Sequence, residues 1–176
     1  MFLDPRAALI FGANAALLYL TLMVDSALAG SSLYLFLAGP MVVLPALYLR
    51  HKSYFICTLC SGLWLDAALP SAFGLFTLSF LFGGALIFNV RVRFRADKNF
   101  HPVLLAHVLN ALFIILLVLS EGRGQLGADV FWLQVLTTLL LSHLVLLFVA
   151  PWFFDLQRVL FELCHLDNEP DNYPMR

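Results

Sequence analysis

Long apolar stretches separated by short polar connections dominate the chain. A membrane-spanning helix needs about 20 mostly apolar residues, with a range near 17–25. Six stretches meet or approach that length: Ala7–Val24, Leu33–Leu49, Tyr54–Leu69, Ala72–Val90, Val103–Leu119 and Val130–Ala150. The third is the shortest, and we expect it to stand in the membrane as half of a hairpin with the fourth. The pattern predicts an all-α membrane protein with six transmembrane helices, of which consecutive ones are neighbours.

Prolines and aromatic residues modify this pattern in two places. Pro40 and Pro45 remove backbone donors within the second stretch, so we expect a kink there. After the sixth stretch, apolar residues recur at helical spacing among charged ones, which predicts an interfacial helix that continues from it. The chain therefore divides into a six-helix transmembrane domain, residues 1–152, and a cytoplasmic part, residues 153–176, which ends in a polar, disordered tail.

Composition supports the membrane assignment. Of the 176 residues, 62% are hydrophobic and 12% charged, whereas soluble domains average about 45–50% apolar and about 25% charged residues. The first apolar run is longer than the core of a secretory signal, which has about 7–15 residues, so we expect it to be retained as a helix. Three cysteines give no disulfide framework.

The distribution of basic residues predicts the orientation. With six spans and a cytoplasmic N-terminus, nine of the ten Lys and Arg residues fall on the cytoplasmic side, and only Arg123 falls outside. Both termini are then cytoplasmic. The densest basic segment is a cytoplasmic loop containing Arg91, Arg93, Arg95 and Lys98. It either only fixes the topology or also attracts anionic lipid and acidic partners; nucleic acid is not expected so close to the bilayer.

One carboxylate, Asp66, lies inside the third apolar stretch. A charged side chain at the bilayer centre costs about 2.5–3.5 kcal/mol on insertion scales, so such residues usually face protein or water. In one interpretation, Asp66 accepts hydrogen bonds from the free backbone N–H groups that open the next helix. In the other, it serves a functional site. The two interpretations are compatible.

Other reactive residue types form no catalytic set. Cys57 and Cys60 make a CxxC motif without a second pair or clustered histidines, so we expect packing and no metal. His107 and His143 lie within spans, where polar side chains more often bond across helices; a proton relay with Asp66 is the alternative. The chain has no GxSxG, HExxH or glycine-rich phosphate loop. We therefore expect a non-enzymatic protein without a cofactor.

Small residues mark two expected helix contacts. Ala8, Gly12 and Ala16 follow one another at four-residue spacing in the first apolar stretch. Such a stripe lets another helix approach closely, and that helix belongs either to this chain or to another protein, with a second copy of the chain left open. Gly83 and Gly84 predict a similar approach in the fourth stretch.

The segment around Asp66 resembles a known family. Gly62, Asp66 and Gly74 stand in the pattern Gly-x3-Asp-x7-Gly, with Trp64 and the turn residue Pro70 between them. This run is similar to the central motif of the rod shape-determining protein MreD family. Size, six short-looped spans, cytoplasmic ends and a basic-aromatic segment after the last span also match. The sequence differs in having Pro70 where many members have glycine, and in its extended acidic tail.

The resemblance implies a function. Members of that family are inner-membrane, multi-pass scaffolds of the bacterial cell-wall elongation machinery, and they associate with MreC and through it with MreB, RodA and a penicillin-binding transpeptidase. On this basis Gly62, Asp66 and Gly74 would shape an outer hairpin on which a partner segment docks. The family is similar in fold to the substrate-binding S subunits of energy-coupling-factor transporters. The alternative function is therefore an S-type subunit that holds a small molecule near Asp66 and Trp64, although the short outer segments favour the scaffold.

Overall fold

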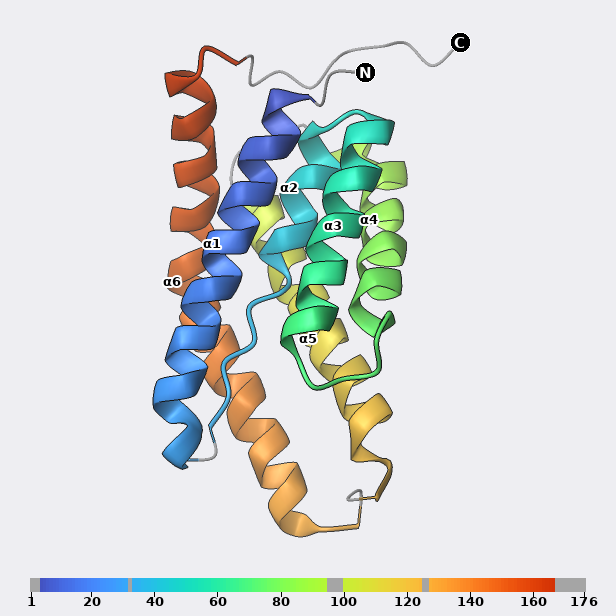
Figure 1. Ribbon diagram of the computed structural model, residues 1–176, viewed down its shortest axis with the longest axis vertical. Coiled ribbons are helices and arrows are strands. Elements are labelled where there is room, and N and C mark those ends of the chain that lie inside the picture. The colour runs from blue at the N-terminus through green and yellow to red at the C-terminus, as the bar shows by residue number, and fades with distance from the viewer. Residues whose placement is uncertain (1–3, 32, 95–99, 125–126, 167–176) are drawn as a thin grey trace.

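The computed structural model describes residues 4–31, 33–94, 100–124 and 127–166 (Figure 1). This part of the chain contains six α-helices and two short 3-10 helices. The α-helices are α1 (Pro5–Leu28), α2 (Pro40–Tyr48), α3 (His51–Ala68), α4 (Leu75–Phe94), α5 (Phe100–Glu121) and α6 (Asp129–Leu163). The 3-10 helices are η1 (Ala29–Ser31), which follows α1, and η2 (Gly122–Gly124), which follows α5. Each α-helix coincides with one apolar stretch, so the all-α prediction is confirmed.

Successive helices run in opposite directions (Figure 1). The start of α1 and the ends of α2, α4 and α6 lie together at what we call the terminal end of the bundle, and the α3–α4 turn points toward the distal end. The shortest helix, α2, contacts α1, α3, α4, α5 and α6. Its residues from Pro40 to Leu47 are all buried, as expected of a helix that is apolar on every side.

The second apolar stretch, Leu33–Leu49, is not one continuous helix. Residues 33–39 are irregular, and α2 starts only at Pro40. A proline suits the first helical position because the backbone N–H that it lacks would have no partner there. The nine residues of α2 correspond to a length of about 14 Å at about 1.5 Å per residue, much less than the about 30 Å of a bilayer core. The prediction of one continuous helix across the second stretch is therefore wrong.

Within the part of the chain that the structure describes, three segments are long and apolar enough to cross a membrane: Pro5–Leu28, Pro102–Ser120 and Asp129–Leu163. These indicate a membrane protein. The apolar part of α4, Leu75–Asn89, is shorter. Helix α6 continues through Pro151 without interruption, so the interfacial helix expected after it forms the last turns of α6. The tail predicted to be disordered, residues 167–176, lies outside the described residues.

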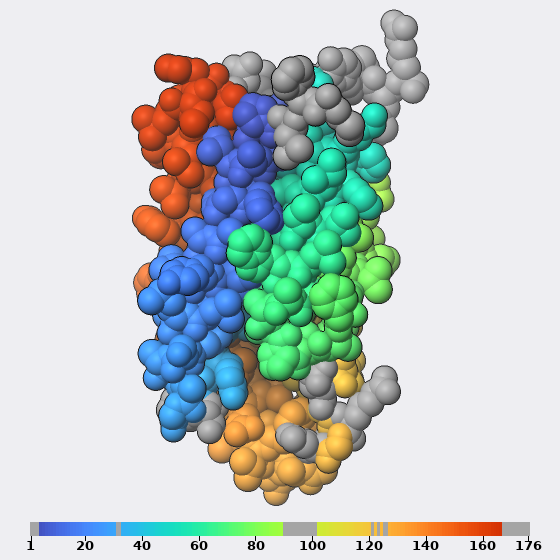
Figure 2. Space-filling model, in the orientation of Figure 1, coloured from blue at the N-terminus to red at the C-terminus, as the bar shows by residue number. Residues whose placement is uncertain are grey.

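Large apolar side chains cover the outside of the bundle, and several polar side chains lie inside it. Phe73, Leu78 and Phe148 are among the most exposed apolar residues. The space-filling view shows the helices packed side by side without a wide opening on this face (Figure 2). Lipid is as apolar as these side chains, so the outward face suits a bilayer. The inward polar groups need partners within the protein.

Candidate functional site

The Asp66 carboxylate holds the start of α4. Asp66 lies in the last turn of α3 and is 3% exposed. Its Oδ1 accepts the backbone N–H of Phe76 at 2.8 Å, and its Oδ2 accepts the backbone N–H of Thr77 at 3.0 Å. The Thr77 hydroxyl donates a third, short hydrogen bond to Oδ2. These are the bonds that we expected from an acid near the hairpin.

This arrangement replaces an ordinary N-cap. Phe76 and Thr77 are the second and third residues of α4, whose N–H groups are usually satisfied by the side chain just before the helix. That residue is Gly74, which has no side chain, and its carbonyl accepts the Leu78 N–H at 3.0 Å. The carboxylate of the preceding helix therefore caps α4 from the outside. A negative charge there also favours the positive end of the helix dipole.

Gly62 makes the approach possible. It lies one turn before Asp66 on the same face of α3. A Cβ atom at Gly62 would stand 2.6 Å from the Thr77 Cα, closer than real Cβ contacts. The absence of a side chain thus lets the start of α4 come within reach of the carboxylate.

The turn between α3 and α4 depends on Gly74, and Pro70 is exposed within it. Gly74 has a φ of +96°, a region that glycine adopts without steric cost. Gly62, Asp66 and Gly74 of the predicted motif therefore act together: one permits close packing, one caps the helix and one permits the turn. The motif forms a single structural unit.

The outer face of this hairpin is apolar. Trp64 is 49% exposed and meets Phe11 of α1 edge to face, with ring centroids 5.7 Å apart. Phe73, in the turn, is 73% exposed. The hairpin ends before the distal tips of α5 and α6 (Figure 1). These rings give the hairpin a surface on which an apolar partner segment can pack.

A second polar centre surrounds the irregular segment 33–39. Asn110 of α5 donates from its amide to the Phe36 carbonyl at 2.9 Å and accepts the Gly39 N–H at 3.1 Å. The Ser142 hydroxyl of α6 accepts the Phe36 N–H at 2.9 Å. The hydrophobic pattern does not reveal this centre, because its members are separated by 71 to 106 positions in the chain. Non-helical backbone inside a membrane needs such side-chain partners.

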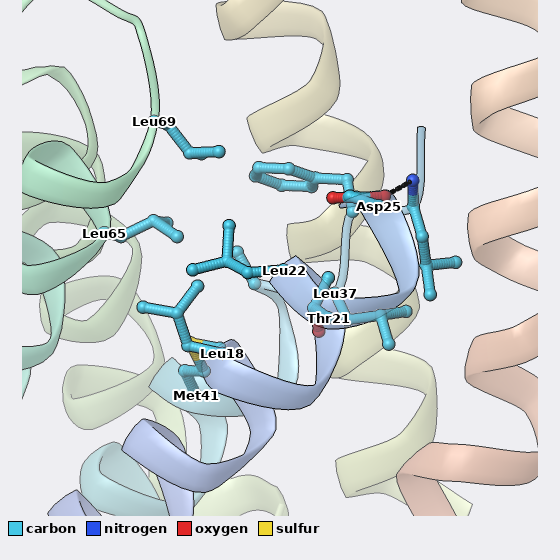
Figure 3. A pocket seen from close by; sticks show the side chains of 11 residues that line it. Leu18, Thr21, Leu22, Asp25, Leu37, Met41, Leu65 and Leu69 are labelled. Carbon is cyan, nitrogen blue, oxygen red and sulfur yellow. Dashed lines mark hydrogen bonds between the residues drawn. The ribbon is translucent and has the colours of Figure 1, made fainter. Parts of the chain in front are cut away.

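Asp25 binds the same segment near the distal end. Its Oδ1 accepts the Leu35 N–H at 2.6 Å (Figure 3). The hollow beside it is lined by side chains of α1, α3 and the irregular segment, among them Leu18 and Leu65, and has a volume of about 10 Å³. That is room for about one water molecule. The hollow near Trp64 is equally small, about 10 Å³.

The two membrane-embedded histidines pair with each other. The Nδ1 atoms of His107 in α5 and His143 in α6 are 2.8 Å apart, and the rings stack with centroids 5.1 Å apart. One ring must donate and the other accept, because a hydrogen bond contains one proton. The expectation of a bond across helices is confirmed. Asp66 binds the start of α4 instead, so these contacts show no relay between the acid and either histidine.

The small residues separate into two groups. Gly83 and Gly84 are buried, and a Cβ atom there would stand 3.2 Å from Leu109 and 2.8 Å from Tyr54, respectively. They bring α4 close to α5 and α3, as predicted.

The stripe on α1 behaves differently. Its three residues are exposed: Ala8, Gly12 and Ala16. A Cβ atom added at Gly12 would meet nothing within 4 Å. The expectation that a helix of the same chain packs on this stripe is therefore wrong, because α2 and α3 contact α1 through its opposite, polar-bearing face. On that face Asn14 donates to the Met41 carbonyl at 2.9 Å and to the Ser61 hydroxyl at 3.0 Å.

The basic segment is partly helical. Arg91 and Arg93 belong to the last turn of α4 and not to a loop. Arg95 and Lys98 lie outside the described residues. Among the residues that the structure describes, no group of three His, Cys, Asp or Glu side chains is arranged to hold a metal ion. Of the CxxC pair, Cys57 is buried and Cys60 is exposed.

The fold and the site define an all-α protein with helices that suit a membrane and with a hairpin locked by one buried carboxylate. Comparison of the chain with protein-family models, with curated proteins and with solved structures finds no match.

Proposed function

We propose that the chain is a non-enzymatic scaffold of the bacterial cell-wall elongation machinery, of the MreD type, in the inner membrane. The observation that carries the proposal is the unit of Gly62, Asp66 and Gly74. All three residues of the motif have a structural task in one hairpin. An acid whose oxygens are occupied by a helix start is a fixed structural element, and the apolar rings of the hairpin then remain for a partner.

The proposed topology has six helical segments and both termini in the cytoplasm. Arg6, Arg50, Lys52 and Arg158 belong to segments at the terminal end of the bundle, and Arg123 belongs to η2 at the distal end. This asymmetry supports a cytoplasmic terminal end. The α3–α4 hairpin would then face the outer side, where a transmembrane or juxtamembrane segment of an MreC-like protein would dock. MreB, RodA and a penicillin-binding transpeptidase would join through that partner.

Co-purification tests the proposal. The full chain is co-expressed with the MreC-like protein encoded nearest to it, and the partner captured in mild detergent is quantified. Phe73→Ser changes the hairpin surface without touching the core, and Phe148→Ser on α6 is its control, because the two rings are 73% and 75% exposed. We expect capture by the wild type and by Phe148→Ser, and loss of capture with Phe73→Ser.

Two outcomes contradict the proposal in different ways. If the wild type captures no partner, the scaffold assignment is wrong. If Phe73→Ser captures as much as the control, the hairpin is not the docking surface. A replacement of Asp66 by alanine in a rod-shaped host that depends on this protein should also widen the cells, because the hairpin loses its fixed shape.

A second function, the S-type transporter subunit, is supported by the exposed stripe of Ala8, Gly12 and Ala16, on which a transducing partner would pack. The hollow beside Trp64, about 10 Å³, favours the scaffold, since it is too small for a vitamin. Native mass spectrometry separates the two: a retained small molecule other than a phospholipid supports the transporter subunit, and a spectrum that contains only the chain and its phospholipid adducts supports the scaffold.

A further inference from the structure

A cavity lies between α2 and α6 near the terminal end, far along the chain from the Asp66 hairpin. It is lined by Leu44, Tyr48, Gln157, Arg158 and Phe161, and its volume is about 100 Å³. A water molecule in liquid takes up about 30 Å³, so the cavity has room for a small polar group and not for a lipid chain. Unlike the hollows beside Asp25 and Trp64, this cavity contains both a charged and an amide side chain.

Gln157 is a buried amide in this cavity. It is only 2% exposed, yet neither its Oε1 nor its Nε2 has a hydrogen-bond partner. Buried side-chain polar groups in proteins are almost always satisfied, and each exception calls for an explanation such as a ligand or an ordered water. The amide can donate two hydrogen bonds and accept two. A matching ligand therefore carries an acceptor and a donor close together.

Arg158 adds positive charge to the same cavity. Its Nη1 lies 3.8 Å from the Asp155 Oδ1, and the two side chains are 49% and 62% exposed. A guanidinium has five donors in a planar fork, and this geometry suits phosphate. The Tyr48 hydroxyl, on α2, is a further donor. The lining therefore offers one cationic group, which also pairs with Asp155, and two further side-chain donors, a set that suits a phosphate.

The position along α6 corresponds to the membrane surface. Trp152 is 62% exposed and follows the apolar part of the helix. Tryptophan concentrates at the level of the lipid headgroups, and Gln157 lies five residues beyond it, about 7.5 Å at about 1.5 Å per residue. The cavity is thus placed where phospholipid phosphates lie.

We propose that this cavity binds the headgroup of an anionic phospholipid whose phosphate carries a hydroxylated substituent, of the phosphatidylglycerol type. The phosphate accepts hydrogen bonds from Arg158 and from the Gln157 Nε2, and a headgroup hydroxyl donates to the Gln157 Oε1. The acyl chains lie on the apolar surface outside the cavity. A soluble glycerol phosphate shares this chemistry and is distinguished by experiment.

Native mass spectrometry of the full chain tests the site. The purified protein in mild detergent receives equal, limiting amounts of phosphatidylglycerol and phosphatidylcholine, and the lipid adducts that survive activation are counted. We expect the wild type to retain phosphatidylglycerol about fivefold better, and Gln157→Leu to remove that preference, because only phosphatidylglycerol has the hydroxyl that donates to the Gln157 Oε1 and one neutral hydrogen bond accounts for about this factor. Gln134→Leu is the control, because Gln134 lies on the same helix and is exposed.

A second variant and a soluble competitor complete the experiment. Arg158 is half-exposed, so Arg158→Gln tests the site even if Gln157→Leu fails to fold. It should also weaken the preference for phosphatidylglycerol over phosphatidylcholine. Displacement of the lipid by soluble glycerol phosphate at equal concentration would support the shared chemistry and assign the ligand to the cytosol. Equal retention of the two lipids by the wild type would overturn the proposal. Unchanged retention in both Gln157→Leu and Arg158→Gln would overturn it too, and the cavity would then hold water only.

Discussion

Replacing Asp66 with alanine leaves the start of α4 without its cap. The Phe76 and Thr77 N–H groups, now bonded at 2.8 and 3.0 Å, would be buried without partners. A stranded buried donor costs about 1–3 kcal/mol, so two of them predict a loss of about 2–6 kcal/mol in the free energy of unfolding. The Thr77 hydroxyl adds little, because it can turn to a carbonyl of the turn three or four residues before it.

Reversible unfolding from mixed micelles by sodium dodecyl sulfate, followed by circular dichroism, measures this loss. Asp66→Asn should fall between the wild type and Asp66→Ala, because the amide keeps one acceptor oxygen but turns two donors toward the helix start. Asp155→Ala is the control: its carboxylate is 62% exposed and pairs with Arg158 at 3.8 Å, and exposed pairs contribute about 0–1 kcal/mol. An Asp66→Ala variant as stable as Asp155→Ala would refute the capping role.

Two further predictions concern the glycines and the irregular segment. Gly62→Ala should lower the free energy of unfolding by about 1–3 kcal/mol, because its Cβ meets the α4 backbone at 2.6 Å. A Cβ at Gly12 meets nothing within 4 Å, so Gly12→Ala should leave the free energy of unfolding unchanged or raise it by up to about 1 kcal/mol. Equal losses for the two variants in the same unfolding assay would contradict the close-packing role of Gly62. Asn110→Ala should speed hydrogen exchange at residues 33–39, because it removes the partners of the Phe36 carbonyl and the Gly39 N–H. Asn89 is exposed, so Asn89→Ala should leave the exchange of these residues unchanged. Equal exchange rates in the two variants would show that other contacts hold the segment.

The hydrophobic pattern predicts most of the helices, and the position of Asp66 near the hairpin indicates the cap as one of its two compatible roles. Apolar runs locate five of the six helices well, because helix formation satisfies the backbone locally and needs no distant partner. The capping role of Asp66 could also be predicted, because an acid near the end of one helix lies close to the N–H groups that open the next. A role for Gly62 and Gly74 in the hairpin was expected only through the family resemblance, and their particular tasks, close packing and a positive φ, came from the structure.

Tertiary structure decided which part of the second apolar stretch is helical and which face of α1 turns inward. An apolar run looks the same whether it is helical or irregular, and residues 33–39 are irregular because Asn110, Ser142 and Asp25 supply their hydrogen bonds from other helices. The face of α1 is likewise set by packing: the polar contacts of Asn14 draw one side inward and leave Gly12 outward. Such choices depend on contacts between residues far apart in the chain, which hydrophobic periodicity does not record.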